Sequence, residues 1–124
     1  MTTDTDPSTT TDPNCLFCKF VTGAIEVGLL AQTPTTIAFR DINPQAPTHV
    51  LVVPRRHVAN AVDLAAASAT DLADLFAVAG SIARDEGLEG GYRLVFNTGA
   101  DAGQTIFHAH LHLLGGRPLG ERTM

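Results

Sequence analysis

The chain has 124 residues, 44% of them hydrophobic, a composition that fits one globular domain with its own core. Its net charge of −5 argues against general binding to nucleic-acid backbones, which depends largely on Lys and Arg. No apolar stretch approaches the roughly 18 residues of a membrane span, and the N-terminus lacks a basic start followed by an apolar run. We therefore expect a cytoplasmic protein that binds neither nucleic acid nor membranes.

The N-terminal segment differs in composition from the rest of the chain. Residues 1–13 (MTTDTDPSTTTDP) consist mainly of Thr, Asp, Ser and Pro, with almost nothing to bury. Such a segment is typical of a disordered tail, and we assign it no function of its own. The pattern is continuous from Asn14 onward, which predicts a single domain over residues 14–124.

The first predicted element is a short helix over residues 16–22, closed by Gly23 as a C-terminal cap. Residues 29–32 and 36–40 then read as two strands of a hairpin that turns near Pro34. A loop with two prolines over residues 41–47 leads into an apolar strand over 50–53 that ends at Pro54.

The second half contains one long amphipathic helix. Ser68 resembles its N-cap and Gly87 ends it. Its apolar residues follow at helical spacing and are Leu72, Leu75, Phe76, Ala79, Ile82 and Ala83. Residues 92–97 and 107–114 are predicted to be the last strands. These elements predict an α+β fold in which the long helix covers one face of an antiparallel sheet of about five strands.

His108, His110 and His112 alternate with apolar residues near the C-terminus. In a strand, this period would place all three imidazoles on one face. Imidazole can act as nucleophile, proton carrier or metal ligand near neutral pH. Alternate strand positions lie about 6.6 Å apart and the outer pair about 13 Å apart, so one metal ion could hardly gather all three. The three histidines must therefore divide the work.

The segment before these histidines, residues 97–105, is rich in glycine and neutral donors. Gly99 and Gly103 permit close backbone approach, and Asn97, Gln104 and Thr105 supply donors without charge. Alone the pattern is weak, because glycine-rich turns are common. Beside three histidines, it indicates a loop that holds a phosphate through amides.

The Cys15-x-x-Cys18 pair is compatible with zinc binding, with a redox pair and with coincidence. Zinc is favoured because His57 and His108 could complete a tetrahedral Cys2His2 set. A redox role is less favoured because no strand precedes the motif to build a thioredoxin-like unit.

Together these motifs resemble the histidine triad (HIT) family, whose signature is His-x-His-x-His followed by two apolar residues. The segment from Asp41 to His49, the strand after it and His57 resemble the Hint branch of that family. Gly103-Gln-Thr105 and Leu114-Gly-Gly-Arg117 also resemble Hint, and the likeness spans residues 14–117. The cysteine pair is similar to zinc-bearing prokaryotic members.

The resemblance implies a HIT-like fold and a hydrolase that cleaves the P–N bond of purine nucleoside 5′-phosphoramidates, conjugates of AMP or GMP. It implies that His110 is the nucleophile, that a covalent nucleotidyl-histidine forms, and that His112 binds the phosphate oxygens. Implied substrate contacts are Asn97, Gly103, Gln104 and Thr105 at the phosphoryl group, Asp41 at the ribose, Phe17, Phe39 and Ile42 at the base, and His49 lining the pocket.

The resemblance further implies a structural zinc ion held by Cys15, Cys18, His57 and His108, and a homodimer. After Arg117 the chain lacks the Trp-containing tail of some Hint proteins, so the leaving group is left open. Two other functions stay in consideration. One is a different HIT enzyme, either a dinucleoside polyphosphate hydrolase or a nucleotidyl transferase, and the other is a non-catalytic nucleotide sensor.

Overall fold

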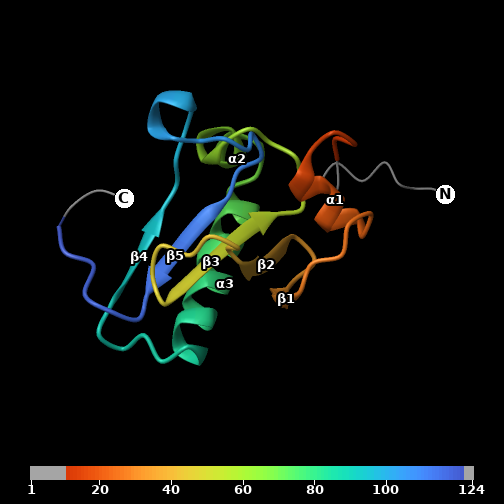
Figure 1. Ribbon diagram of the computed structural model, residues 1–124. Coiled ribbons are helices and arrows are strands. Elements are labelled where there is room, and N and C mark those ends of the chain that lie inside the picture. The colour runs from red at the N-terminus through yellow and green to blue at the C-terminus, as the bar shows by residue number, and fades with distance from the viewer. Residues whose placement is uncertain (1–10, 122–124) are drawn as a thin grey trace.

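A five-stranded antiparallel sheet forms the centre of the molecule, with the strand order β1-β2-β3-β5-β4 (Figure 1). The computed structural model describes residues 11–121. The strands are β1 (Leu29–Gln32), β2 (Thr36–Arg40), β3 (Thr48–Pro54), β4 (Tyr92–Val95) and β5 (Leu111–Gly115), and the α-helices are α1 (Leu16–Thr22), α2 (Ala61–Ala67) and α3 (Ala69–Asp85).

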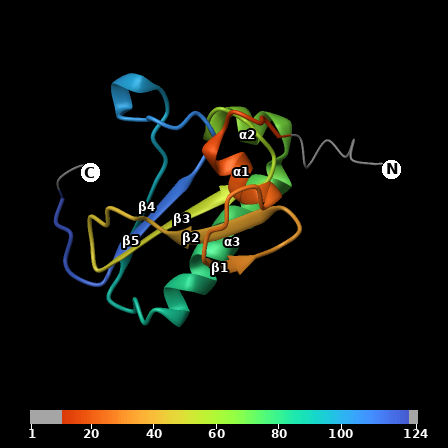
Figure 2. The same ribbon diagram turned by 45° about the vertical axis from the view of Figure 1, so that its right-hand side comes forward.

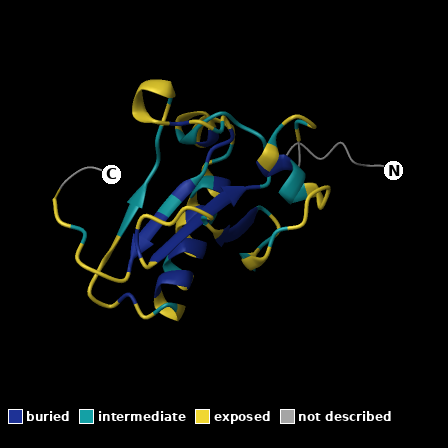
Figure 3. Cartoon of the chain, viewed as in Figure 1, coloured by how far each residue is buried: buried dark blue, intermediate teal, exposed yellow. Residues whose placement is uncertain are grey.

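The long helix α3 packs across one face of the sheet (Figures 1 and 2). Alternate residues of the central strands point toward it, including Val50 and Val52 on β3 and Leu111 and Leu113 on β5, and all four are fully buried. On α3 the buried side chains include Leu75, Val78, Ala79, Ile82 and Ala83. This is the expected amphipathic face except at Phe76, which was expected on it but is 44% exposed. Packing against this face makes β3 and β5 the most enclosed strands (Figure 3).

The opposite face of the sheet carries a second, smaller core beneath α1. Phe17 of α1 packs there with Ile37, Phe39, Leu51 and Val53. Because side chains alternate along a strand, this is also the face toward which His49 of β3 and His112 of β5 point. The sheet thus separates a structural layer around α3 from a layer that gathers the histidines.

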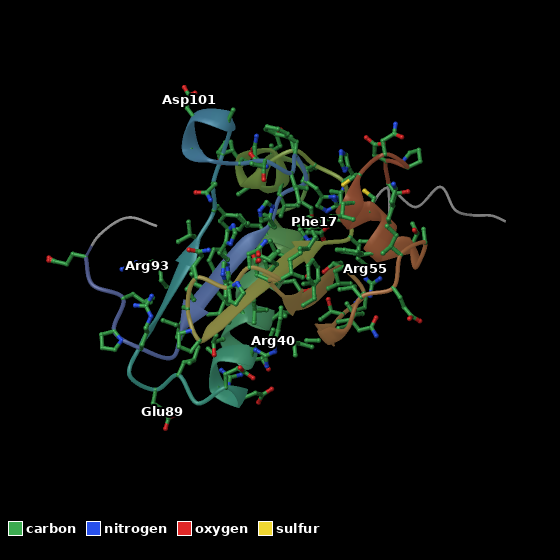
Figure 4. The ribbon with its side chains drawn as sticks, in the orientation of Figure 1. Phe17, Arg40, Arg55, Glu89, Arg93 and Asp101 are labelled. Carbon is green, nitrogen blue, oxygen red and sulfur yellow. The ribbon has the colours of Figure 1, made fainter. Side chains whose placement is uncertain are left out.

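Polar contacts connect α3 to the hairpin of β1 and β2. The Oδ2 atom of Asp74 accepts hydrogen bonds from the hydroxyls of Thr33, Thr35 and Thr36 at 2.6, 2.8 and 2.7 Å. At the other end of the helix, Arg40 (labelled in Figure 4) donates to both carboxylate oxygens of Glu86 at 3.1 and 3.0 Å.

The α+β architecture predicted from the sequence is confirmed. Helix α1 ends at Gly23, which adopts φ 82° as its left-handed cap, and β1 and β2 form the expected hairpin. The register of that hairpin shifts between Leu29 and Ala31. Helix α2 was not predicted. It is only seven residues long, begins at the N-cap Asn60, and shares Ser68 with α3 as a common cap.

One expected element is wrong in a way that matters for the site. The final strand was predicted over residues 107–114, but β5 begins at Leu111. His108 and His110 therefore precede the strand, and only His112 lies on it. Tertiary contacts hold the earlier segment: the Ala109 N–H donates to the Val58 carbonyl at 2.8 Å, outside the β-ladder.

Most of the predicted disordered tail lies outside the described residues. Residues 11–13 are described, and Asp12 contacts Cys15 and Cys18. Among the helices of residues 11–121, none has both the length and the apolar character needed to cross a membrane.

Candidate active site and metal cluster

The three histidines of the signature point to two different places. His108 is fully buried and faces Cys15, Cys18 and His57, whereas His110 and His112 lie together with ring centroids 5.0 Å apart. This separation is possible because His108 lies before the start of β5, where the side chains do not follow the alternation of a strand. The histidines therefore occupy two separate locations, which is compatible with the expected division of roles. They do not share one face of a strand, which was the arrangement expected from their spacing.

The tautomer of His110 follows from one hydrogen bond. Its Nδ1 lies 2.8 Å from the backbone carbonyl oxygen of His108, and a carbonyl can only accept. Nδ1 must therefore carry the proton, which leaves the lone pair of a neutral ring on Nε2. Phe17 (labelled in Figure 4) packs against this ring edge to face, with centroids 5.2 Å apart. The ring is therefore held with a nucleophilic nitrogen available.

A second chain of hydrogen bonds fixes His112. The Gln45 N–H donates to His49 Nδ1 at 3.0 Å, so a neutral His49 carries its proton on Nε2. That Nε2 lies 3.0 Å from His112 Nδ1 and 3.5 Å from Asp41 Oδ2. His112 Nδ1 is therefore the acceptor, and the His112 proton sits on Nε2. An N–H donor is thus set up beside His110.

Burial keeps this pair neutral. Burial, together with the neighbouring His110 and His49, lowers the pKa of His112 to about 4, while Asp41 opposes the shift. Burial also lowers the pKa of His49, which is 4% exposed, and Asp41 again acts in the opposite direction. Neutral rings have defined donors and acceptors, so the tautomers above persist at neutral pH.

The loop over residues 97–105 forms as a turn with the short 3₁₀ helix η2 (Ala100–Ala102) between two glycines of positive φ. Gln104 is 4% exposed, and the polar atoms of its side chain are committed inside the protein. Its Oε1 accepts from the Gly99 N–H at 2.8 Å, and its Nε2 donates to the carbonyls of Ala59 and Ile106 at 2.7 and 3.0 Å.

These contacts correct the expected role of Gln104, because no donor of its side chain is left for a phosphate. It braces the loop instead. Thr105 and Gly103 are exposed and Asn97 is half-buried, so these three stay accessible to a ligand.

The residues expected at the base do not form an open slot. Phe17 and Phe39 touch edge to face with centroids 5.6 Å apart, and both are almost fully buried. The structure therefore does not separate these rings to receive a base between them. Ile42, by contrast, is 92% exposed, and Asp41 lies at the start of the same loop with its Oδ1 accepting from the Asn43 N–H.

Four donor atoms converge at the start of α1. His108 Nδ1 lies 3.4 Å from Cys15 Sγ and 3.5 Å from Cys18 Sγ, and His57 Nδ1 lies 3.3 Å from Cys18 Sγ. The two Nδ1 atoms are 3.2 Å apart. For a tetrahedral zinc ion with ordinary bond lengths, sulfur and nitrogen ligands stand about 3.6 Å apart and two nitrogens about 3.3 Å apart. The cluster therefore fits a metal ion of this size.

The orientation of His108 supports the same interpretation. Its Nε2 lies 2.7 Å from the Pro54 carbonyl oxygen and so carries the ring proton, which leaves the Nδ1 lone pair facing the cysteines. Burial lowers the pKa of His108 to about 4, so the ring is neutral, as a ligand must be. Burial raises the pKa of the Cys18 thiol to about 11, so an incoming ion must displace its proton.

Asp41, His49 and His112 also bring three ligand-type atoms together. The hydrogen bond from Gln45 places the His49 proton on Nε2, the atom that faces the other two. A protonated nitrogen has no lone pair for a metal. The cysteine cluster is therefore the candidate metal site, and this second group is a hydrogen-bond chain.

A pocket of about 430 Å³ lies beside the cluster. Its lining includes Asp12, Cys15, Leu16, Thr105 and Phe107. Sequence reasoning did not identify the Gln45 N–H or the Pro54 carbonyl, which fix the tautomers of His49 and His108. Backbone groups leave no signal in residue identity, whereas Asp12 could have been noticed from its spacing to the cysteines.

Comparison with known proteins agrees with this geometry. The family model described as "HIT domain" matches residues 22–119. The chain is 43% identical over 106 residues to a protein of Escherichia coli K12 named purine nucleoside phosphoramidase, a match that covers 85% of this chain and 89% of that protein.

Two solved structures are also similar. A HIT family hydrolase from Clostridium thermocellum superposes with a TM-score of 0.87 at 42% identity, covering 92% of this chain and 100% of the other. A HIT family hydrolase from Legionella pneumophila gives a TM-score of 0.82 at 46% identity, covering 86% and 96%. With its histidine arrangement, its sheet and these matches taken together, the chain belongs to the HIT domain family.

Proposed function

We propose that the protein is a hydrolase that cleaves the P–N bond of purine nucleoside 5′-phosphoramidates through a covalent intermediate on His110. The observation that carries the proposal is the hydrogen bond from His110 Nδ1 to the His108 carbonyl, which presents a nucleophilic Nε2 next to an N–H donor on His112. The name of the similar E. coli protein supports the P–N bond as the one cleaved.

In the first step, the lone pair of His110 Nε2 attacks phosphorus and the bond from phosphorus to the leaving nitrogen breaks. The amine departs with the electron pair of that bond and takes up a proton from solvent. The nucleotidyl-histidine formed is a cationic ring, because Nδ1 keeps its proton. The 2.8 Å hydrogen bond to the His108 carbonyl becomes charge-assisted and stabilises this ring.

In the second step, water attacks the phosphorus and the N–P bond breaks. The products are nucleoside monophosphate and a neutral His110, and the proton lost by water passes to solvent. Because the ring is cationic in the intermediate, its nitrogen leaves readily. One displacement of an amine is thereby divided into two easier steps.

His112 and the loop over 97–105 would hold the phosphoryl group. The Nε2–H of His112 donates to a phosphate oxygen, and the low pKa of this ring means that a neutral donor does so. Accessible Thr105 and Asn97 supply further donors, whereas the Gly103 N–H already donates to the Ala100 carbonyl at 3.0 Å, so we propose that Gly103 only allows the phosphoryl group to approach the backbone closely. Donors positioned before the reaction stabilise the charge that moves onto these oxygens during transfer.

The nucleoside would lie along the loop that starts at Asp41. We propose that this carboxylate accepts from the ribose hydroxyls and that exposed Ile42 covers the base. Because Phe17 and Phe39 are in contact with each other and almost fully buried, a base would pack between them only after these rings move.

We propose that Cys15, Cys18, His57 and His108 bind one zinc ion with a structural role. Four protein ligands fill a tetrahedral shell and leave no position for water or substrate. The ion would fix α1 to the segment after β3. Cysteines at this spacing that form no disulfide are typical of a reducing compartment, so we also propose a cytoplasmic location.

We also propose a homodimer. β4 is an edge strand of the sheet, and Tyr92 on it and Phe76 on α3 are each 44% exposed. Phe76 contacts Phe96, just after β4, with centroids 6.0 Å apart, so helix and strand together offer an apolar surface. Light scattering of the purified protein would give its mass directly.

Intact-protein mass spectrometry during turnover of adenosine 5′-phosphoramidate tests the reaction. The expected result is release of AMP with a transient gain of one adenylyl group, absent in His110→Ala, while that variant still binds AMP. Full turnover by His110→Ala would refute the nucleophile.

Comparing diadenosine polyphosphate as a second substrate separates the other enzymes of the family from the proposed one. Binding of AMP without turnover of either compound would instead favour the nucleotide sensor.

A further inference from the structure

Asp12 lies in the segment that sequence analysis assigned to a functionless tail, yet it contacts three of the residues around the metal cluster. Its backbone N–H donates to Cys18 Sγ at 3.3 Å, and its carbonyl accepts from the Cys15 N–H at 3.0 Å. Its Oδ2 lies 3.9 Å from His57 Nε2. We propose that Asp12 is a positioning residue for the metal cluster, raising metal affinity through Cys18 and His57 without ligating the ion.

The contact with Cys18 concerns charge. A thiolate bound to a metal ion retains excess negative charge, and an N–H donor stabilises it. Cys18 is 1% exposed, so water cannot supply that donor. The Asp12 N–H points at this sulfur, and it is held there because the Asp12 carbonyl is fixed by the Cys15 N–H.

The contact with His57 concerns the tautomer. His57 faces Cys18 and His108 through Nδ1, so a metal-bound His57 carries its proton on Nε2. That N–H is directed to the side where Asp12 Oδ2 lies. A carboxylate behind a ligating histidine orients the ring and makes its other nitrogen a better donor to the ion. At 3.9 Å the pair is longer than a hydrogen bond, and a small movement of either side chain would close it.

The carboxylate itself is held in place. Asp12 Oδ1 accepts from the Asn14 N–H at 2.8 Å, which leaves Oδ2 turned toward His57. An asparagine at this position has only one acceptor oxygen. It can keep the turn with Asn14 or face the His57 N–H, but it cannot do both. We expect Asp12→Asn to keep the turn, whose hydrogen bond is 2.8 Å long, and to lose the 3.9 Å contact with His57, so this variant separates the metal-directed role from the turn.

The test measures zinc affinity of the full chain by competition with a chromophoric chelator. Asp12→Asn is expected to raise the Kd for Zn²⁺ about tenfold, the lower end of the effect of such outer contacts, and Asp12→Ala is expected to raise it further. Asp85→Asn, at the exposed end of α3, removes the same charge elsewhere and is expected to change the Kd less than about twofold.

Melting temperatures of the zinc-loaded and metal-free forms distinguish a metal-directed role from a purely structural one. We expect Asp12→Asn to lower the melting temperature of the loaded form only, because weaker binding contributes less to stability. Equal losses in both forms, an unchanged Kd, or an equal loss in Asp85→Asn would overturn the proposal. Failure of the wild-type chain to take up one zinc ion would overturn it as well. None of these readouts depends on phosphoramidase activity.

Discussion

Replacing Asp74 by alanine should reveal how strongly α3 is fixed to the β1–β2 hairpin. One carboxylate oxygen accepts from Thr33, Thr35 and Thr36 at 2.6–2.8 Å. Burial acts to raise the pKa of Asp74, but the three hydroxyls outweigh it and the pKa lies below its usual value. The ionised form is therefore the one that stabilises the fold.

The magnitude follows from the surroundings of each hydroxyl. Thr36 is 0% exposed, so its hydroxyl would be left without a partner at a cost of about 1–3 kcal/mol. Thr33 and Thr35 are half-buried and can turn to water, so each contributes about 0.5–1 kcal/mol. We expect Asp74→Ala to lower the free energy of unfolding by about 2–5 kcal/mol, and Asp74→Asn to cost less.

Urea unfolding of the wild type, Asp74→Ala, Thr36→Val and the double variant forms the assay. Valine removes the buried hydroxyl with little change of shape, so Thr36→Val should cost less in the Asp74→Ala background than in the wild type. We expect a coupling energy of about 1 kcal/mol or more between the two positions. Equal costs of Thr36→Val in both backgrounds, or a loss below about 0.5 kcal/mol for Asp74→Ala, would refute this reasoning.

Three other perturbations have expected outcomes. Cys15→Ser should lower zinc content and melting temperature more than it lowers kcat per folded molecule. Metal analysis, thermal melting and active-site titration would measure these three quantities. An unchanged zinc content would contradict the metal assignment. The metal-free protein should lose stability as pH falls from about 6.5 to about 4. In this range His108 and His112 become protonated in the unfolded chain but stay neutral in the folded protein, so protons favour unfolding. Urea unfolding midpoints measured across this range would test the sign. His108 alone accounts for up to about 3 kcal/mol of that loss. His49→Phe keeps a ring but removes the donor to His112 Nδ1, so kcat should fall about tenfold or more, while an unchanged kcat would show that His112 needs no such partner.

The sequence was a good guide where local signals determine structure. Gly23 marked the end of α1, and the apolar spacing along α3 marked the face that packs on the sheet. Helix α2 escaped notice because it is one short segment whose cap residue Ser68 also begins α3. Because Ser68 both ends α2 and begins α3, the sequence shows one clear helix start in a region that contains two helices.

The site was harder to predict because its geometry depends on contacts distant in sequence. Alternation of His108, His110 and His112 has the period of a strand, but the hydrogen bond from Ala109 to Val58 draws the first two out of the ladder. The residue type of Gln104 suggested a phosphate donor, yet its amide is satisfied by carbonyls of the protein. Residue identity shows which groups can form a hydrogen bond, and the fold decides which partner each one meets.

The two edges of the sheet differ in a way that limits assembly. At β1 the register is broken between Leu29 and Ala31, which disrupts the even row of backbone groups that a new strand needs. At β4 the pairs with β5 run without interruption from Tyr92 to Val95, so its outer side is a regular template. If two copies paired antiparallel through their β4 strands, the β4 edge of each sheet would be covered by the other copy. Only the two irregular β1 edges would then remain at the outside of the joined sheet. Such a sheet would stop growing at two subunits, so the irregularity at Leu29 would protect against fibrous aggregation.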